Sequence, residues 1–228
     1  MDQSSSGFLE SLGTDLRRRV QAQMRIVRAR RGQALLGRGA ISTDVYFVQE
    51  GSLNVVVYSA NGREVSLRAL GPGDVFGELA AIDGLPRSAS VVAETEARVA
   101  VLRQEEFVAC IEQSAGAALW VARALAAKVR DMNERIFELS ALNVQARLHC
   151  ELLRLAKAGP EGGAPLVVDP APTHAELANR IGTHREAVTR EMRVLVHHKV
   201  IRAGRRTLEF VDLARLEHFV GQAIGELR

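Results

Sequence analysis

Two charged side chains in the stretch DVFGELAAIDGLPRSASV (74–91) have the types and the spacing to hold a small anion. Glu78 and Arg87 stand at the two ends of a short connection of small and apolar residues, between two segments expected to be strands. A guanidinium can donate two parallel hydrogen bonds to a phosphate, backbone N–H groups at a helix start can add to them, and a carboxylate accepts from sugar hydroxyls. The pair therefore predicts a site for one small anion that carries a sugar hydroxyl. A surface ion pair is the alternative, but it gives no reason for the small residues between.

A second set of charged residues lies in PTHAELANRIGTHREAVTREMRVLVHHKVIRAGRRTLEFVD (172–212). Apolar residues recur there at helical spacing: Leu177, Ala178 and Ile181 in one helix, and Ala187, Val188, Met192 and Leu195 in the next. Gly182 opens a three-residue turn between them, which is typical of a helix-turn-helix unit. Four residues near the start of the second helix lie off its apolar face: Arg185, Glu186, Thr189 and Arg190. In that position arginine can read guanine and a carboxylate can read cytosine.

The end of this segment, VIRAGRRTLEFV, predicts a β-hairpin with its turn near Ala203–Arg206. Arg202, Arg205 and Arg206 would then lie against phosphates, as the wing of a winged helix does. For each piece alone a solvated charged face is the alternative. Their coincidence favours DNA binding.

The elements that must position Glu78 and Arg87 are short strands. The runs VYFVQEG, LNVVVYSANG, EVSLRALGPG and ASVVAETEARVAVL recur with glycine turns between them, which predicts a jelly-roll sandwich or barrel. Alternation predicts five inward residues: Val45, Phe47, Leu53, Val55 and Val57. The pattern also predicts a strand pair around Gly51 and a hairpin at Asn61–Gly62.

Helical periodicity replaces the strands from about residue 105 to 143. The apolar positions step by four and three in alternation: Ala118, Ala122, Leu125, Val129, Met132, Ile136 and Leu139. This seam predicts a long helix that pairs with its copy in a symmetric dimer, with packing onto the chain's own β-domain as the alternative. We therefore expect a β-domain over 1–115, a dimerisation helix and hinge over 116–144 with Asn143 as the hinge, and a DNA-binding domain over 145–228. A loop around a short Leu166–Val168 strand is expected after a further helix, VQARLHCELLRLAKAG.

Composition agrees with a two-domain globular protein: of 228 residues, 47% are apolar and 25% charged. The polar start MDQSSSGFLESL is unlike a signal peptide and no apolar run is long enough to span a bilayer, so we expect a cytoplasmic location. Cys110 and Cys150 are expected to be buried small hydrophobes. Residues 145–228 hold 13 Lys and Arg against 10 Asp and Glu, which accounts for the whole net charge of +3.

The motifs FGELA…RSASV and IGTHREAVTRE, with the long helix between them, resemble the CRP/FNR family of bacterial transcription regulators, in its cAMP receptor branch. The likeness runs from about residue 20 to 212, and the second motif matches the family's Gly-x-x-Arg-Glu-x-Val-x-Arg recognition helix. The resemblance implies an α+β chain: an N-terminal β-roll that binds a cyclic nucleotide, a long dimerisation helix and a C-terminal winged helix-turn-helix.

The same resemblance assigns residues to the ligand. It places Glu78 on the ribose 2′-hydroxyl, Arg87 and Ser88 on the cyclic phosphate, and the backbone of Gly77, Leu79 and Ala89 around it. It places four residues near the base: Leu67, Arg68, Met132 and Asn133. Arg68, Met132 and Asn133 depart from the family pattern, in which the base meets a small polar residue and helix hydroxyls. The resemblance puts cAMP first as the ligand. Because arginine pairs well with guanine, cGMP is expected close behind.

For DNA, the resemblance implies TGTGA-type half-sites in an inverted repeat, with Thr173, His174 and His184 near phosphates. The two histidines replace an arginine and a serine of relatives, so DNA affinity is expected to rise as pH falls. RNA polymerase is the further partner implied. In relatives that activate, a basic patch on the β-domain touches polymerase; here the matching stretch RQEEF carries Glu105 and Glu106.

Two other functions stay open. One is a regulator whose DNA binding needs no ligand or a different ligand. The other is an enzyme acting on cyclic nucleotides, which the sequence disfavours because its six histidines form no ligand-spaced cluster. We expect no metal and no catalytic cofactor. An N-terminus without cysteine argues against an iron–sulfur sensor, and the absence of histidine before His149 argues against haem in the β-domain.

Overall fold

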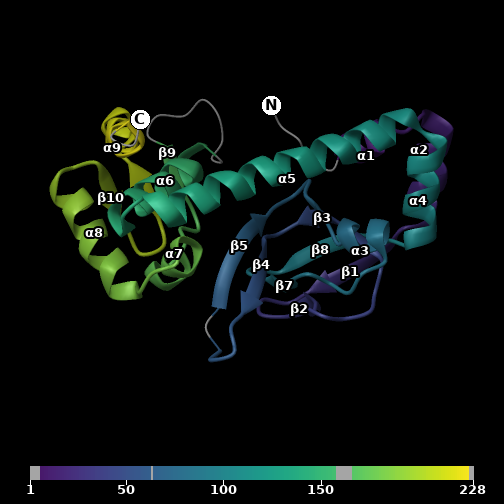
Figure 1. Cartoon of the computed structure of the whole chain (residues 1–228), viewed down its shortest axis with the longest axis horizontal. Helices are drawn as coiled ribbons and strands as arrows, with labels where there is room; N and C mark the ends of the chain where they lie inside the picture. Colours follow the sequence, from purple (N-terminus) through teal and green to yellow (C-terminus); the bar gives the residue numbers. More distant parts are fainter. Residues whose placement is uncertain (1–5, 63, 158–165, 226–228) are drawn as a thin grey trace. The chain divides into compact units, whose positions relative to one another are not determined.

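The computed structural model describes residues 6–62, 64–157 and 166–225. The chain divides into two compact units, residues 1–130 and 131–228 (Figure 1). Strands dominate the first unit and helices the second, so the α+β class is as predicted. Helix α5 (Ala115–Ala141) runs through the boundary between the two units.

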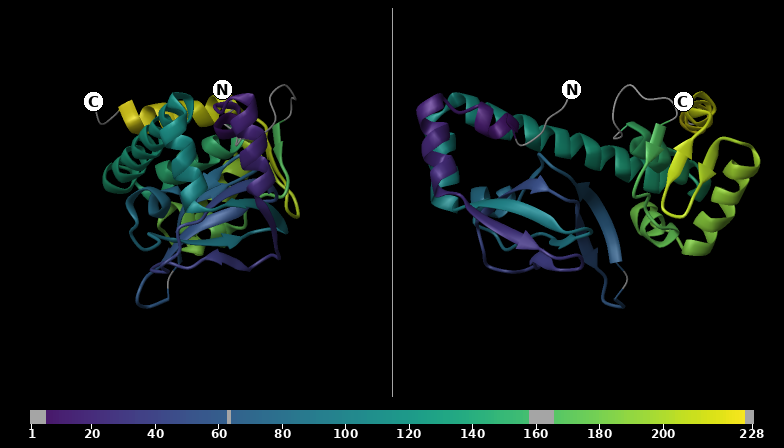
Figure 2. Two further views of the ribbon diagram at one scale, coloured as in Figure 1. Left: turned by 90° about the vertical axis from the view of Figure 1, so that its right-hand side faces the viewer. Right: turned by 180° about the vertical axis from the view of Figure 1, so that it is seen from behind.

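The first unit contains two four-stranded antiparallel sheets (Figure 2). One has the order β1 (Arg25–Ala29), β8 (Ala97–Leu102), β3 (Val45–Glu50) and β6 (Val75–Phe76). The other has the order β2 (Ala34–Leu36), β7 (Ser90–Ala93), β4 (Leu53–Tyr58) and β5 (Glu64–Leu70). The jelly-roll prediction is confirmed. The predicted hairpin is confirmed as well, because β4 and β5 pair with each other from Tyr58 and Glu64, next to the turn, to Leu53 and Leu70.

Two details of the predicted strand pattern are wrong. Strands β3 and β4 do not pair around Gly51, because they belong to different sheets. Gly51 has a φ of +82°, and a Cβ there would collide with the Glu96 carbonyl, so the chain crosses between the sheets where only glycine fits. The inward alternation also fails: the register of β4 with β5 shifts after Val55, and Val56, not Val57, is buried.

Strand β3 is buried on both faces, which alternation alone does not predict. Val45 and Phe47 pack in a cluster with helical residues, while Tyr46 and Val48 pack in the core between the sheets. The helices that supply the first cluster are α1 (Ser6–Glu10), α2 (Thr14–Gln23), α3 (Glu78–Asp83), α4 (Gln104–Gln113) and the start of α5.

The N-terminal helix α1 is held by aromatic contacts. Phe8 is fully buried, and its ring centroid lies 5.3 Å from that of Trp120 on α5 and 5.1 Å from that of Phe107 on α4. A Cβ at Gly7 would lie 2.6 Å from the Trp120 indole nitrogen, so α1 approaches α5 as closely as glycine allows.

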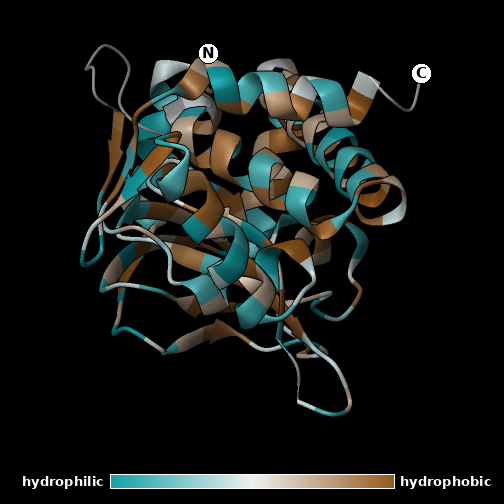
Figure 3. Cartoon of the chain, turned by 90° about the vertical axis from the view of Figure 1, so that its left-hand side faces the viewer, coloured by the Kyte–Doolittle hydropathy of each residue, from teal (hydrophilic) through white to brown (hydrophobic). Residues whose placement is uncertain are grey.

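The second unit has a helical core with a small sheet. Its helices are α6 (Val144–Lys157), α7 (His174–Ile181), α8 (Arg185–His197) and α9 (Leu213–Gly225). Strands β9 (Leu166–Val168), β10 (Ile201–Ala203) and β11 (Leu208–Phe210) form an antiparallel sheet of order β10-β11-β9. Teal and brown bands alternate along the helices in Figure 3, as expected for amphipathic elements. The loop expected before β9 lies outside the described residues.

The predicted helix-turn-helix and wing are confirmed. Leu177, Ile181, Val188 and Leu195 are all buried in one core, and Gly182 ends α7 with a φ of +66°. Ala187 is only half-buried. The hairpin turns between Ala203 and Leu208, as expected.

Both cysteines are buried thiols without a disulfide, as predicted. Burial raises the pKa of the Cys150 thiol to about 11, so it is uncharged at neutral pH. Among the described residues, no group of three or more His, Cys, Asp or Glu side chains could hold a metal ion.

Candidate ligand site and DNA-contact surface

The Arg87 guanidinium is buried in the first unit, with 4% of the residue exposed. Its Nε donates to Ser42 Oγ at 3.0 Å, its Nη1 to Gly77 O at 2.7 Å and its Nη2 to Asp44 O at 2.7 Å. All three acceptors are neutral oxygens. Burial therefore lowers the pKa of Arg87, although Tyr46, Asp44 and Glu78 oppose that shift.

This arrangement fixes the guanidinium and still leaves donors for a ligand. Arginine has five N–H donors, and the three bonds above fix its plane. One N–H remains on each terminal nitrogen, and a phosphate oxygen can accept from each of them. None of the three bonded oxygens carries a charge, and a buried cation that lacks a direct ion pair is costly, so an anion that completes the site would be bound strongly.

Gly77 is the backbone position that makes room for this side chain. It has a φ of +84°, and a Cβ there would lie 2.7 Å from Arg87 Nη1 and 2.9 Å from Asp44 O. Gly77 precedes α3 (Glu78–Asp83), whose first N–H groups have no acceptor within the helix. The segment thus brings Gly77, Glu78 and Arg87 together, as the sequence predicts. Of the other residues expected here, Ser88 and Leu79 are exposed and Ala89 is half-buried.

Glu78 is also buried, with 7% exposed, and it has an ion-pair partner that the sequence did not predict. Lys128 Nζ on α5 donates to Glu78 Oε1 at 2.5 Å. One signal was available: Lys128 lies one helical turn before Met132, on the same side of the predicted helix. The pair joins α5 to α3 within the first unit, and a carboxylate can accept further hydrogen bonds.

Of the residues expected near the base, Leu67 and Arg68 belong to the first unit, and Met132 and Asn133 to the second. Arg68 forms an ion pair with Asp74 at 2.6 Å, and Asp74 also accepts from the Gly71 N–H. Leu67 is the extra residue where the register of β4 and β5 shifts, and it is exposed. Met132 and Asn133 are exposed on α5 in the second unit.

On the second unit, Arg185, Glu186 and Arg190 are exposed at the start of α8, as predicted. Thr189 differs: it is half-buried, and its hydroxyl donates to the Arg185 carbonyl at 2.9 Å. That hydroxyl also lies 2.9 Å from His174 Nδ1 and therefore accepts from it. Thr189 thus positions α7 against α8. The prediction that its side chain projects outward is wrong.

The phosphate-facing candidates are also partly engaged. The Thr173 hydroxyl accepts from the Glu176 N–H and caps α7, and the Glu176 carboxylate accepts from the Thr173 N–H in return. His184 is exposed and precedes α8. In the wing, Arg205 and Arg206 are exposed in the turn, whereas Arg202 pairs with Glu209 at 2.5 Å.

Comparisons with known proteins match both parts of the chain. A family model for the cyclic nucleotide-binding domain matches residues 26–114, and one for the Crp-like helix-turn-helix domain matches residues 146–219. The "Cyclic AMP receptor protein" of Thermus thermophilus is 32% identical over 186 residues, which covers 82% of this chain and 83% of that protein. The "CRP-like cAMP-activated global transcriptional regulator" of Mycobacterium tuberculosis is 28% identical over 187 residues and covers 82% and 84%.

Solved structures give the same result for the fold. A transcriptional regulator of the CRP family from Thermus thermophilus is 29% identical, with a TM-score of 0.71 over 86% of this chain and 96% of that one. FixK2 from Bradyrhizobium japonicum covers the same shares with a TM-score of 0.77 and, at 17% identity, shows the fold alone. Within the described part of the chain, no helix is both long and apolar enough to cross a membrane.

Proposed function

The chain belongs to the CRP/FNR family, as a cyclic-nucleotide-binding and DNA-binding transcription regulator, and we propose that it is a cAMP-responsive homodimer acting on inverted-repeat DNA in the cytoplasm. One observation carries the ligand half of this proposal. Arg87 is a buried cation held by three neutral oxygens beside the buried Glu78 carboxylate, which matches a ligand with an anionic phosphate and a sugar hydroxyl.

In this proposal Arg87 and Ser88 hold the cyclic phosphate. The backbone of Gly77, Leu79 and Ala89 completes the cradle, and Glu78 accepts from the ribose 2′-hydroxyl. Each charge-assisted hydrogen bond contributes about 1.5–3 kcal/mol. Three or four such bonds reach the roughly −8 kcal/mol of micromolar affinity after the costs of binding.

The preference for cAMP over cGMP is supported by Arg68. Its fork would suit the O6 and N7 acceptors of guanine, but Asp74 already engages it at 2.6 Å. A guanine would have to compete with that ion pair. We propose that Asn133 meets the purine edge by hydrogen bonding and that Met132 and Leu67 pack against the base, since neither offers a strong donor or acceptor.

The dimer is supported by the exposure of the α5 seam. Val129, Met132 and Ile136 are 57%, 61% and 58% exposed on the single chain. A second α5 packed along this seam would cover them. The two recognition helices would then read TGTGA-like half-sites about one DNA turn apart, roughly 34 Å.

A mobility shift on inverted-repeat DNA tests the proposal, with no ligand, cAMP or cGMP. We expect the strongest complex with cAMP, a weaker one with cGMP and the weakest without ligand. Equal complexes in all three lanes would contradict a ligand-responsive regulator, and a stronger complex with cGMP would contradict the ligand preference.

The ion pair between Lys128 and Glu78 favours one second candidate, a regulator that binds DNA without a ligand. The Lys128 ammonium at 2.5 Å supplies Glu78 with a donor that a bound sugar would otherwise provide. Titration calorimetry separates the two candidates. Heat on adding cAMP supports the sensor, and no heat with either cAMP or cGMP supports the second candidate.

Replacing Arg185 with alanine should cost about 1–3 kcal/mol of operator affinity and relax the preference at one base pair, because it removes a bidentate base contact. Replacing Arg205 with alanine should instead weaken all sequences alike, because a phosphate contact carries no sequence information. Fluorescence anisotropy on the operator and on single-base variants measures both. An equal loss of affinity for all DNA sequences in the Arg185→Ala protein would contradict the role of Arg185 in reading a base.

DNA affinity should rise as pH falls from 7.5 to 5.5. Burial and the nearby positive charges of Arg185 and Arg193 lower the pKa of His174 below 6.5, so it is neutral at pH 7. A DNA phosphate would favour the protonated form, so binding takes up a proton. Each unit by which DNA raises this pKa is worth up to tenfold in affinity. Anisotropy at constant salt measures this dependence.

His174→Gln should flatten that pH profile, and His184→Gln serves as the control for the second histidine. The folding stability of the protein should fall, not rise, as the pH falls. The lowered pKa means that the unfolded chain binds the proton more readily, so folding stability is full above about pH 6.5 and falls below it. Operator affinity of the parent protein that stays flat between pH 7.5 and 5.5 would contradict the prediction.

RNA polymerase is the remaining proposed partner. Glu105 is exposed and Glu106 half-buried in the first turn of α4, and Glu106 accepts from Gln23 Nε2 at 3.0 Å. An acidic surface does not suit the contact that the basic patch of relatives makes. We therefore propose that polymerase is met through another surface of the dimer.

A further inference from the structure

The middle of the recognition helix α8 is hydrogen-bonded to α6 through the carboxylate of Glu191. Glu191 Oε1 lies 2.9 Å from His149 Nε2 and accepts from Gln145 Nε2 at 3.0 Å. The side chains of His149 and Glu191 are only 6% and 14% exposed. Because a carboxylate only accepts, His149 Nε2 carries a hydrogen and donates it. This bond forms with a neutral or a protonated ring, since Nε2 can carry a hydrogen in both.

The C-terminal helix α9 packs on the same histidine. The Phe219 ring stacks on the His149 ring, with the centroids 5.4 Å apart and the planes at 28°. Arg215 lies over the Phe219 ring, and its Nη1 donates to the His198 carbonyl at 3.3 Å. His198 ends α8, where carbonyl groups have no partner within the helix. Helix α9 therefore holds the end of α8 directly and its middle through His149.

The apolar face of α8 does not fix the orientation of the helix by itself. Val188, Met192 and Leu195 are buried in the core of the second unit, but hydrophobic contact is non-directional. A helix held by such contacts alone can rotate or slide slightly and keep most of its buried area. Hydrogen bonds weaken steeply as their geometry changes. The bond from His149 therefore restrains the rotation and the axial position of α8 at Glu191.

The predicted base readers depend on this orientation. Arg190 directly precedes Glu191, and Arg185 and Glu186 lie in the first turn of the same helix. An arginine that donates two hydrogen bonds to one guanine needs both at about 2.9–3.0 Å and nearly linear. A small rotation of α8 would break such a pair of bonds.

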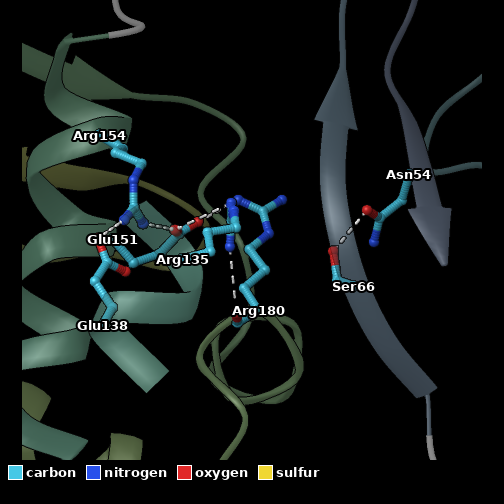
Figure 4. Close-up of polar contacts among 7 residues, drawn as sticks. All are labelled: Asn54, Ser66, Arg135, Glu138, Glu151, Arg154 and Arg180. Atoms are coloured by element: carbon cyan, nitrogen blue, oxygen red, sulfur yellow. Dashed lines mark hydrogen bonds and ion pairs between the residues drawn. The ribbon is translucent and has the colours of Figure 1, made fainter. Parts of the chain in front are cut away.

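Helix α6 holds α7, the other helix of the helix-turn-helix, through different side chains. Figure 4 shows Glu151 of α6, which accepts from Arg154 Nη1 at 2.7 Å and from Arg180 Nη1 of α7 at 3.4 Å. None of these residues contributes to the contacts of Glu191. A substitution at His149 or Glu191 therefore leaves these bonds of α7 in place.

We propose that His149 and Glu191 are positioning residues of the recognition helix, and that α9 supports them. This inference rests on the proposed function, in which residues near the start of α8 read bases. His149 and Glu191 need not touch DNA. They act by holding α8 at the rotation at which the readers reach the base edges, so their loss lowers sequence discrimination more than affinity for DNA in general.

Fluorescence anisotropy tests the proposal with two duplexes of equal length, an operator that the parent protein selects from random DNA and a non-operator sequence. His149→Ala and Glu191→Ala should each lower the ratio of operator affinity to non-operator affinity at least about tenfold, the order of one lost base contact. The change in net charge cancels in this ratio, because phosphate contacts carry no sequence information. The double variant should lose at most about threefold more than the worse single variant, because both changes break one contact.

A conservative variant and two controls separate positioning from folding. His149→Gln places an amide donor near the position of Nε2 and should keep the ratio within about threefold of the parent. His218→Ala and Glu217→Ala remove the same two side-chain types from exposed positions of α9 and should leave the ratio unchanged. If circular dichroism shows that His149→Ala does not fold, His149→Leu replaces it, because leucine keeps an apolar contact with Phe219 and has no donor.

Equal losses of affinity for the two duplexes would assign His149 and Glu191 a role in folding alone and overturn the proposal. Losses that add in the double variant, or a His149→Gln protein no better than His149→Ala, would overturn it as well. A parent protein that selects no operator contradicts the proposed function, and this inference falls with it. A selected operator whose preference survives both substitutions overturns this inference alone.

Discussion

The Arg87→Leu protein should lose at least 100-fold in affinity for cAMP, and its operator binding should no longer respond to the ligand. The reason is the geometry of the buried guanidinium, which keeps one N–H on each terminal nitrogen for the phosphate. Losing two charge-assisted hydrogen bonds costs about 3–6 kcal/mol, and every 1.4 kcal/mol is tenfold in affinity. Titration calorimetry and a mobility shift with cAMP measure the two effects.

This variant also removes three hydrogen bonds that hold the β-roll, so its folding must be measured. Each buried carbonyl left without a donor costs about 1–3 kcal/mol, which lowers the melting temperature. Arg87→Lys is the matched variant: it keeps a positive charge but loses the planar fork, and its ligand affinity should lie between those of the parent and Arg87→Leu. A folded Arg87→Leu protein with unchanged cAMP affinity would rule out this site.

The second large effect is expected for a charge placed in the α5 seam. Ile136→Glu should convert the dimer to monomers at micromolar concentration, because two carboxylates would face one another across an apolar seam. Operator affinity should then fall at least 100-fold, since each half-site is bound alone and the gain from linked binding is lost. Sedimentation velocity and anisotropy measure the two consequences.

Arg130→Glu provides the control on the same helix. It places a carboxylate at an exposed position, 6 residues before Ile136 and off the seam. The control should remain dimeric. A dimeric Ile136→Glu protein, or a parent protein that sediments as a monomer with full operator affinity, would contradict the proposed assembly.

Local signals in the sequence were sufficient for most elements. Gly182 between two amphipathic helices predicts the helix-turn-helix, because the chain needs a left-handed residue there and glycine supplies it at no steric cost. Asn61–Gly62 predicts the β4–β5 hairpin for a related reason. The strand pairing around Gly51 could not be derived, because it depends on which sheet each strand joins. The burial of Val56 depends on a shift in the register of β4 and β5, which an alternation of inward and outward residues does not predict.

The candidate site was predictable where its parts are close in sequence and not where they are distant. Gly77, Glu78 and Arg87 lie within eleven residues of one another. The Lys128–Glu78 pair joins residues 50 positions apart, and Ser42 reaches Arg87 across 45 positions. Arg68 forms an ion pair with Asp74, and Thr189 forms a hydrogen bond with His174. Both contacts depend on the direction in which the side chains point. Residue type alone does not give that direction.

The contact between Phe8 and Trp120 gives the protein an internal optical reporter. Trp120 is the only tryptophan among the 228 residues, and it lies in the first compact unit, against Phe8 and Gly7. Its emission therefore follows the unfolding of residues 1–130, whereas far-ultraviolet circular dichroism follows both units. Denaturant curves from the two signals that fail to superimpose would show that the two halves melt separately, without any label.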